Sequence, residues 1–242
     1  LPDGEGWAVE FVELSTHNGT HMDAPWHFHS TTDSGATPAP SIDEAPLDRF
    51  FRPGVKLDFS HLPHGHEVSA QEVQQALEAI GYDLQPLDIV LVQSGAIYGT
   101  DSFTDQGCGM GAEATLYLTE RGVQVVGTDA WSWDAPFVHT AKKYGETHDA
   151  SLIWEGHKAG RDIGYCHLEK LHNLEVLPPN GFTGKVHEIN ATVGGSYRMS
   201  FTNFTTGQSH SFGRGGRSGS QGGTAERGDP GIVHPPGSLQ SG

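Results

Sequence analysis

The alternation of apolar and polar residues predicts strands and helices along the chain. Residues 8–16 alternate with a period of two, and residues 55–59 repeat the pattern on a shorter scale, so both segments indicate strands. Residues 88–94 contain the apolar run IVLVQ, which is typical of a strand buried on both faces of a sheet. Residues 123–127 predict a further strand.

Helical patterns lie between these strands. We expect three helices, at 69–80, 112–121 and 151–159, and a strand or turn near 174–177. Ser69 and Glu72 have the spacing of a capping box, and Gly81 is suited to end the first helix. The order of strand, helix and strand predicts an α/β domain.

The composition changes towards the C-terminal part of the sequence. From Thr205 onward glycine, serine and arginine dominate, as in GQSHSFGRGGRSGSQGG, and few large apolar residues remain. Such a segment buries too little surface to offset the entropy of ordering the chain. We therefore divide the chain into a folded domain at 1–182 and a divergent tail at 183–242, which we expect to be disordered.

Composition and charge limit the classes of partner. The chain has 242 residues, of which 35% are hydrophobic, enough for the core of one medium-sized domain or of at most two small ones. Its 30 acidic and 14 basic residues give a net charge of -16, which argues against nucleic acid or an anionic membrane as a partner. No apolar run approaches the length of a membrane span. A small molecule is the expected binding partner.

The cysteines indicate a reducing compartment. Cys108 and Cys166 lie far apart in the sequence, which does not suggest a disulfide framework. The first residues, LPDGEGWAVEF, do not have the basic and apolar pattern of a secretory leader. We expect a cytoplasmic protein.

The segment HNGTHMDAPWH carries the strongest chemical signal. Its candidate ligands and proton carriers are His17, His21, Asp23 and His27, all at odd positions, so an extended segment would place them on one side. The glycine and proline within it argue against a helix. Two imidazoles and a carboxylate suit Zn²⁺ or Mn²⁺ and leave coordination positions open for catalysis. Asp23 has two oxygens and could bridge two ions.

A second candidate pair, His157 and Glu169, is weaker on spacing alone. Other acids and histidines compete with it nearby, namely His148, Asp149, Asp162, His167 and His172. Further candidates flank the motifs. The aromatic residues Trp26, Trp131, Trp133 and Phe137 could line a pocket for a planar substrate or pack in the core. Asp129 could orient a ligand histidine or cap the end of a strand.

These residues match a known pattern. The segment 17–27 resembles the signature His-x-Gly-Thr-His-x-Asp-x-Pro-x-His of the cyclase-like metal-dependent hydrolases, which include bacterial kynurenine formamidases and isatin hydrolases. Residues 127–129 and 154–174 look like two further family elements. In the last of these the family's ligand histidine and glutamate lie twelve apart, as His157 and Glu169 do.

The resemblance implies a fold and a site. The fold would be the family's swivelling β/β/α domain, with a mixed sheet and flanking helices. One ion would bind His17, His21 and Asp23, and Asp23 would also bridge to a second ion held by His157 and Glu169. His27 would be the acid and base, although a ligand or hydrogen-bonding role is open to it.

The resemblance also implies an activity. The expected reaction is metal-dependent hydrolysis of an amide C–N bond, of the type that converts N-formylkynurenine to kynurenine in tryptophan catabolism. The alternatives are hydrolysis of a cyclic amide or lactone, and a catalytically inactive metal-binding protein. A homodimer or homotetramer is the implied assembly.

Overall fold

The computed structural model describes residues 4, 6, 9–176, 182–190, 196–203 and 207–214. Its main sheet consists of β1 (His21–Asp23), β4 (Gly54–Asp58), β6 (Ile89–Gln93), β8 (Val125–Thr128), β9 (Cys166–Glu169), β10 (Phe182–Ile189), β11 (Tyr197–Asn203) and β12 (Ser209–Arg214). Two small ladders pair β2 (Thr31–Thr32) with β3 (Thr37–Pro38), and β5 (Glu67–Val68) with β7 (Gly109–Met110).

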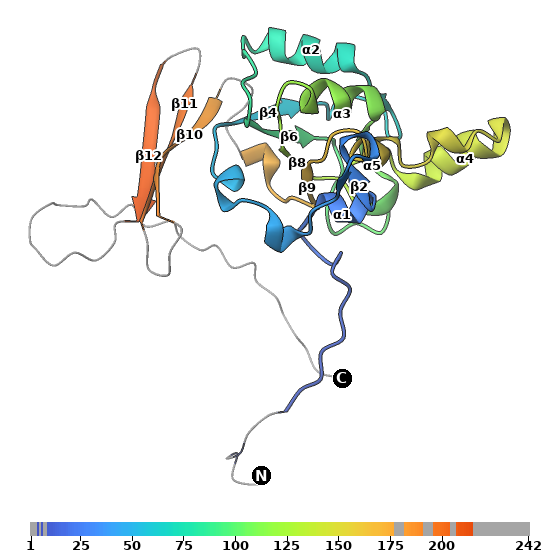
Figure 1. Ribbon diagram of the computed structural model, residues 1–242, viewed down its shortest axis with the longest axis horizontal. Coiled ribbons are helices and arrows are strands. Elements are labelled where there is room, and N and C mark those ends of the chain that lie inside the picture. The colour runs from blue at the N-terminus through green and yellow to red at the C-terminus, as the bar shows by residue number, and fades with distance from the viewer. Residues whose placement is uncertain are drawn as a thin grey trace, which may run out of the picture.

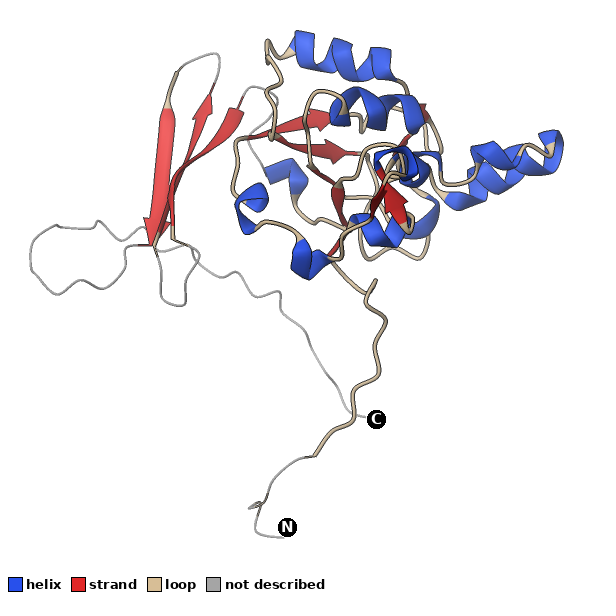
Figure 2. Cartoon of the chain, viewed as in Figure 1, coloured by secondary structure: helices blue, strands red, loops and turns tan. Residues whose placement is uncertain are grey.

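Short helices connect these strands (Figure 2). The α-helices are α1 (Pro25–Phe28), α2 (Ala70–Ala79), α3 (Ala112–Thr119), α4 (Phe137–Thr147) and α5 (Glu155–Ala159). Single 3₁₀ turns occur at Asp33–Gly35, Ile42–Glu44, Leu47–Phe50, Phe103–Asp105, Ala150–Leu152 and Leu174–Val176. Among the described residues, none of these helices combines the length and apolarity that a membrane span requires.

The main sheet is mixed. Its strand order is β1-β9-β8-β6-β4-β10-β11-β12, with β9, β8, β6 and β4 parallel to one another. β1 and β10 run antiparallel to their neighbours at either side of this parallel layer. Helices α2 and α3 pack beside each other over the sheet (Figure 1). The predicted α/β class, with a large mixed sheet flanked by helices, is confirmed.

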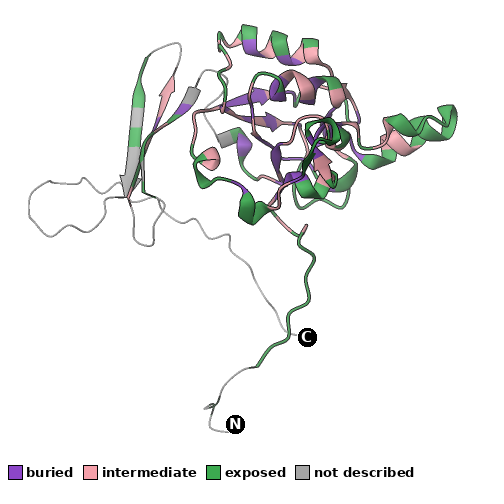
Figure 3. Ribbon diagram, in the orientation of Figure 1, coloured by how far each residue is buried: buried purple, intermediate pink, exposed green. Residues whose placement is uncertain are grey.

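The core lies between the parallel strands and these helices. Val90 and Val92 of β6 are fully buried with Val73 of α2 and Leu118 of α3 in one apolar cluster. Burial is concentrated on the parallel strands (Figure 3). The predicted capping box is present, since Ser69 accepts the Glu72 N–H while the Glu72 carboxylate accepts the Ser69 N–H. Hydrophobic burial thus holds the layer that positions the site.

The predicted strand at 8–16 is wrong for the residues that the structure describes there. Residues 9–15 have no regular secondary structure, and they extend from the body of the protein (Figure 1). The side chain of Phe11 is fully exposed. An alternating pattern forms a strand only where a neighbouring strand supplies hydrogen bonds. Among the described residues, the first segment of the chain to pair in this way is β1, with β9.

The disordered tail predicted from residue 183 is also wrong in part. β10, β11 and β12 form consecutive antiparallel pairs between residues 182 and 214. Hairpins close over short loops and pair their backbones, so they form here with few large apolar residues. Residues 215–242 lie outside the described part of the chain. Near 174–177, the predicted strand or turn is the 3₁₀ turn Leu174–Val176.

The predicted helix at 151–159 forms only in its second half. Ala150–Leu152 is a 3₁₀ turn, and α5 begins at Glu155. The Asp149 carboxylate accepts the Ser151 N–H at 2.9 Å, which favours the tight turn before the helix. Helix α4 and strand β9, which is part of the parallel layer, are among the elements that the sequence does not predict.

Candidate metal centre

The site is built on the antiparallel pair of β1 and β9. Their register sets His21 opposite Glu169 and Asp23 opposite His167. Because side chains alternate along a strand, these four lie on one face of the sheet. The intervening Met22 packs instead with an apolar cluster on the other face. Strand pairing therefore brings together two sequence motifs that lie about 145 residues apart.

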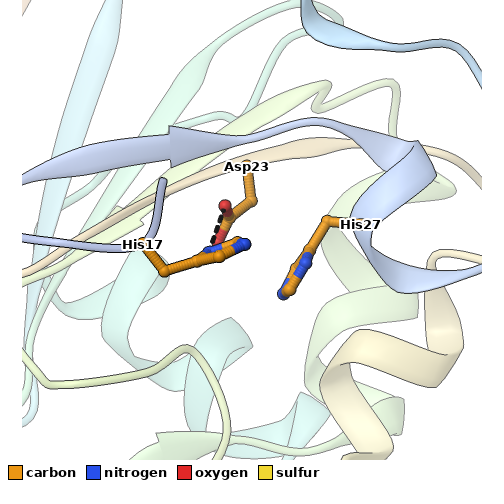
Figure 4. A group of neighbouring side chains, drawn as sticks. All are labelled: His17, Asp23 and His27. Atoms are coloured by element: carbon orange, nitrogen blue, oxygen red, sulfur yellow. Dashed lines mark ion pairs between the residues drawn. The ribbon is translucent and has the colours of Figure 1, made fainter. Parts of the chain in front are cut away.

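The first motif clusters as predicted. The His17 Nδ1 lies 3.0 Å from Asp23 Oδ1 and 3.1 Å from His21 Nε2, and His21 Nε2 lies 3.5 Å from Asp23 Oδ2. Figure 4 shows His17 from the loop before β1 and His27 from α1, with Asp23 directed towards His17. Asp23 is buried, whereas His17 is half-buried. The three predicted ligands of one ion thus converge.

Local backbone contacts fix the orientation of His21. Its Nδ1 lies 2.8 Å from the Gly19 carbonyl oxygen, so this nitrogen carries the proton and donates it. Nε2, which faces Asp23 and His17, is then left with a lone pair. Gly19 has a φ of +64°, a left-handed conformation that favours glycine. Metal-ligating histidines commonly donate their second nitrogen in this way.

His167 is the central residue that sequence reasoning missed as a site residue. It is fully buried, and its Nε2 donates to Asp23 Oδ2 at 2.9 Å and lies 3.2 Å from Glu169 Oε1. Its Nδ1 is buried and has no hydrogen-bond partner among the described residues. The sequence offers it only as a competitor of His157, because the pattern of residues 166–169 does not predict a strand.

The charges of this cluster depend on one another. Burial lowers the pKa of His167, but the hydrogen bonds to Asp23 and Glu169 and the negative charges of these two groups together outweigh burial and raise that pKa overall. Burial raises the pKa values of the two carboxyl groups, but the hydrogen bond from His167 and the positive charge of His167, joined for Glu169 by that of Lys170, together outweigh burial, so both pKa values fall. The cluster therefore holds two buried carboxylates ready to bind a cation.

The second predicted pair is also near the cluster. Ligand atoms of His157, His167 and Glu169 lie within 4.8 Å of one another, as do those of His21, Asp23 and Glu169. A ligand atom of His157 therefore lies within 4.8 Å of one of Glu169, and Glu169 lies beside the first motif.

Asp134, a residue the sequence did not point to, holds His157. The Nδ1–H of His157 donates a hydrogen bond to the Asp134 carboxylate. The same carboxylate accepts the backbone N–H groups of Gly156 at 2.6 Å and of His157 at 3.1 Å. This leaves His157 Nε2 as the free ring nitrogen, a carboxylate–histidine arrangement typical of metal sites.

His27 faces the cluster from α1. Its ring centroid lies 4.2 Å from that of His17 and 5.6 Å from that of His157. Partial burial lowers the pKa of His27, with the Asp23 charge acting in the opposite direction. A lowered pKa keeps the imidazole neutral at neutral pH, which is the form of a general base.

An open cavity of about 450 Å³ lies over these groups. It is lined by His17, His27, Phe28, Trp131, Ser132, Trp154, His157, Lys158, Glu169 and Lys170. A second cavity of about 420 Å³ has Trp131, Ser132 and Trp154 in common with it. Volumes of this size fit a small organic molecule.

The structure divides the predicted aromatic wall. Trp131 lines both cavities and Phe137 lines the second, where its ring stacks on Trp154 at 5.6 Å. Trp133 is buried in the core and donates its Nε1–H to Thr115 Oγ1 at 3.0 Å, so its assignment to substrate binding is wrong. Trp26 is largely exposed and is not among the residues that line either cavity.

Asp129 does not orient a ligand histidine in this structure. Its Oδ1 accepts both the backbone N–H of Ser94 at 2.7 Å and the Ser94 hydroxyl at 2.6 Å. It thus ties the end of β8 to the end of β6, which is the capping role left open by the sequence. Burial raises the pKa of Asp129, against these hydrogen bonds.

Known proteins resemble this chain in sequence. A family model described as "Putative cyclase" matches residues 4–135. A kynurenine formamidase of Bacillus cytotoxicus is 26% identical over 123 residues, which are 51% of this chain and 51% of that protein. A kynurenine formamidase of Bacillus mycoides is 24% identical over the same coverage. The chain spans about half the length of these relatives.

Solved structures resemble it in fold. An isatin hydrolase bound to the product analogue thioisatinate matches with a TM-score of 0.54 and 19% identity, covering 78% of this chain and 72% of the other. Isatin hydrolase A from Labrenzia aggregata, bound to benzyl benzoate, matches with a TM-score of 0.53 and 24% identity, covering 77% and 72%. At this identity the likeness concerns the fold.

Proposed function

This chain belongs to the family described as putative cyclases, and from that premise we propose that it is a metal-dependent hydrolase that cleaves an amide C–N bond. One observation carries the proposal: buried carboxylates and oriented imidazoles converge beside an open cavity, with the neutral His27 on its wall.

The donor set fits a divalent ion. Two ligand atoms that each lie about 2.1 Å from a tetrahedral ion are about 3.4 Å apart. The separations among His17 Nδ1, His21 Nε2 and the Asp23 oxygens are 3.0, 3.1 and 3.5 Å. The proton of His21 is also held away from the cluster, by the Gly19 carbonyl. These residues would hold one ion, with nitrogen and oxygen donors that suit Zn²⁺ or Mn²⁺.

A second ion would be held by His157 and Glu169, with Asp23 between the two positions. Asp134 fixes His157 with its Nε2 unprotonated. His167 lies between Asp23 and Glu169 and would either keep the two carboxylates in place or serve as a ligand itself. The buried Nδ1 of His167 has no hydrogen-bond partner among the described residues, which supports a bound group as its missing partner.

A bound divalent ion supplies a water whose pKa falls from about 16 towards 7, and polarises a carbonyl oxygen. The chain's own residues supply the proton transfers. A ring nitrogen of His27 takes a proton from the attacking water and then delivers it to the departing nitrogen, because an amine anion is a poor leaving group. Trp131 and Trp154 cover one side of the cavity and would hold a planar aryl group against this machinery.

The proposed substrate is an arylformamide of the N-formylkynurenine type. The kynurenine formamidases are sequence relatives over half their length, and the aromatic wall suits an aryl group. Hydrolysis of a cyclic amide is the second candidate, since the isatin hydrolases have the same fold. Both reactions use one site, so a panel of both substrate types, with added Zn²⁺ or Mn²⁺, separates them.

The test combines metal analysis with turnover. We expect His21→Ala and Asp23→Ala to lose bound metal and hydrolysis together. We expect His27→Ala to retain metal and to lose about 10²- to 10⁴-fold in kcat. His29→Ala is the matched control, because His29 is a neighbouring histidine that contacts Thr31 and is not among the cavity-lining residues.

Other outcomes have defined meanings. Full activity in Asp23→Ala would refute the metal assignment. Metal loss in His27→Ala would make His27 a ligand. Metal binding with no turnover on either substrate type would make the protein a catalytically inactive metal-binding protein.

The assembly is proposed to be a homodimer or homotetramer. The exposed apolar side chains of residues 9–14 support an interface, since Phe11 is fully exposed and Val12 is 78% exposed. Light scattering on the purified protein tests this, and a monomer at micromolar concentration would contradict it.

A further inference from the structure

We infer that Lys170 is the anion-binding group of the cavity and that the substrate is an aromatic amide with a carboxylate on the ring position adjacent to the one that bears the amide nitrogen. This inference deepens the proposed function and rests on it for the amide. Its first support is position: Lys170 lines the cavity directly after Glu169, and its side chain is 4% exposed.

The ammonium group of Lys170 has fewer hydrogen-bond acceptors than it has donors. An ammonium has three hydrogen-bond donors. Within the described part of the chain, Nζ has one hydrogen-bond acceptor, Glu169 Oε2 at 3.0 Å, and lies 4.4 Å above the Trp131 ring. If Glu169 ligates an ion, its negative charge is shared with that ion, and the ammonium then attracts a further anion more strongly.

The other buried lysine provides a contrast. Lys56 is also buried, but its Nζ donates to the side-chain oxygen of Gln93 at 2.7 Å and to the Leu174 carbonyl at 3.2 Å. Both are neutral oxygens, and Lys56 is not among the cavity-lining residues. Lys56 therefore connects two segments of the fold, whereas Lys170 presents its charge to a cavity.

The backbone holds Lys170 in an unusual conformation. Its φ is +56°, in the left-handed region that side-chain-bearing residues rarely adopt. Its N–H donates to the Ala130 carbonyl at 3.0 Å, and its carbonyl accepts the Thr20 hydroxyl at 2.6 Å. Strain of this kind persists where surrounding contacts impose it, and it is concentrated at functional sites.

The position of the charge defines the substrate. Trp131 lies against Lys170 and lines both cavities, so a ring that contacts Trp131 brings its substituents close to the ammonium. Because Nζ is only 3.0 Å from a candidate ligand carboxylate, the anion that it binds must lie near the scissile bond. A carboxylate on the adjacent ring position meets this requirement.

The test compares charged and neutral ligands. We would titrate 2-aminobenzoate and aniline into the metal-loaded and metal-free protein by calorimetry, and compare kcat/KM for 2-formamidobenzoate and formanilide. We expect the wild-type protein to bind 2-aminobenzoate about tenfold or more tightly than aniline, the strength of one charge-assisted hydrogen bond. Lys170→Met should bring this ratio close to one, and Lys170→Arg should retain most of it.

Lys158→Met is the matched control. Lys158 lines the same cavity, but it is exposed and its Nζ donates to the Ala150 carbonyl at 3.0 Å. We expect it to keep the wild-type ratio. A ratio near one in the wild-type protein would overturn the inference, even if a variant failed to fold.

A wild-type ratio in Lys170→Met would also overturn it, because the anion would then bind the metal or Lys158. If a Lys170-dependent ratio is found in binding but no formamide is hydrolysed, the anion site stands and the proposed function fails.

Discussion

Asp134 offers the sharpest test of how the site is organised. Its carboxylate accepts two backbone N–H groups and the Nδ1–H of His157. In Asp134→Asn, the oxygen that accepts the backbone N–H and the Nδ1–H of His157 becomes an amide NH₂ group. That amide would donate to His157 Nδ1, which moves the ring proton to Nε2, the nitrogen that a metal ion needs.

The expected magnitude follows from these contacts. Losing an orienting partner of a metal ligand typically weakens metal affinity by about 10- to 100-fold, or about 1.4–2.7 kcal/mol. The metal-free protein should also be less stable, because the backbone N–H of His157 loses its charged acceptor, a hydrogen bond worth about 1.5–3 kcal/mol. We therefore expect the free energy of unfolding to fall by about 1.5–3 kcal/mol.

Two measurements check this prediction. Competition with a chromophoric chelator gives the metal affinity, and urea unfolding of the metal-free protein gives the stability. Asp149→Asn is the matched control, because Asp149 also accepts a backbone N–H at the start of a turn, that of Ser151. Wild-type metal affinity in a folded Asp134→Asn protein would refute the assignment of His157 as an oriented ligand.

Three further predictions concern the core and pH. Trp133→Phe removes the buried hydrogen bond to Thr115, so urea unfolding should show a loss of about 1–2 kcal/mol with metal affinity unchanged; altered substrate KM would instead return Trp133 to the binding site. Gly109→Ala places a Cβ atom 1.9 Å from the backbone nitrogen of Ala135, and should lower the free energy of unfolding by about 3 kcal/mol or more, visible as a reduced Tm; an unchanged Tm would contradict the close packing. The raised pKa of His167 means that its imidazolium stabilises the folded state fully below about pH 6.5 and less as pH rises through the folded pKa. The stability difference between metal-free wild type and His167→Gln should therefore shrink above about pH 6.5 in pH-dependent melts, and a constant difference would argue against a charged His167.

Local patterns predicted the elements that depend on neighbours in sequence. The apolar run of β6 and the capping box of α2 specify a buried strand and a helix start by themselves. The first motif could likewise be identified, because its four chemical groups lie within eleven residues.

The remaining parts depend on distant contacts. In β9 the polar residues His167 and Glu169 occupy buried positions where a strand usually has apolar residues, so its pattern does not indicate a strand. The role of Asp134 depends on the contact of its loop with α5, where it accepts the Gly156 N–H. Trp133 is buried and Trp131 is exposed, although they lie two residues apart, because the loop directs their side chains differently. Polar residues buried by a site look like surface residues in the sequence.

The pairing of β1 with β9 also sets an order of events during synthesis. Asp23 and His167 are 144 residues apart, which at about 5–20 residues per second separates their emergence by about 7–29 s. Throughout that interval the nascent chain carries the first motif without the residues of β9 that complete the site. An ion that binds both motifs would therefore link β1, at the start of the sheet in sequence, to β9, the last of the parallel strands to be synthesised. Tight metal binding would then be possible only after β9 has been synthesised.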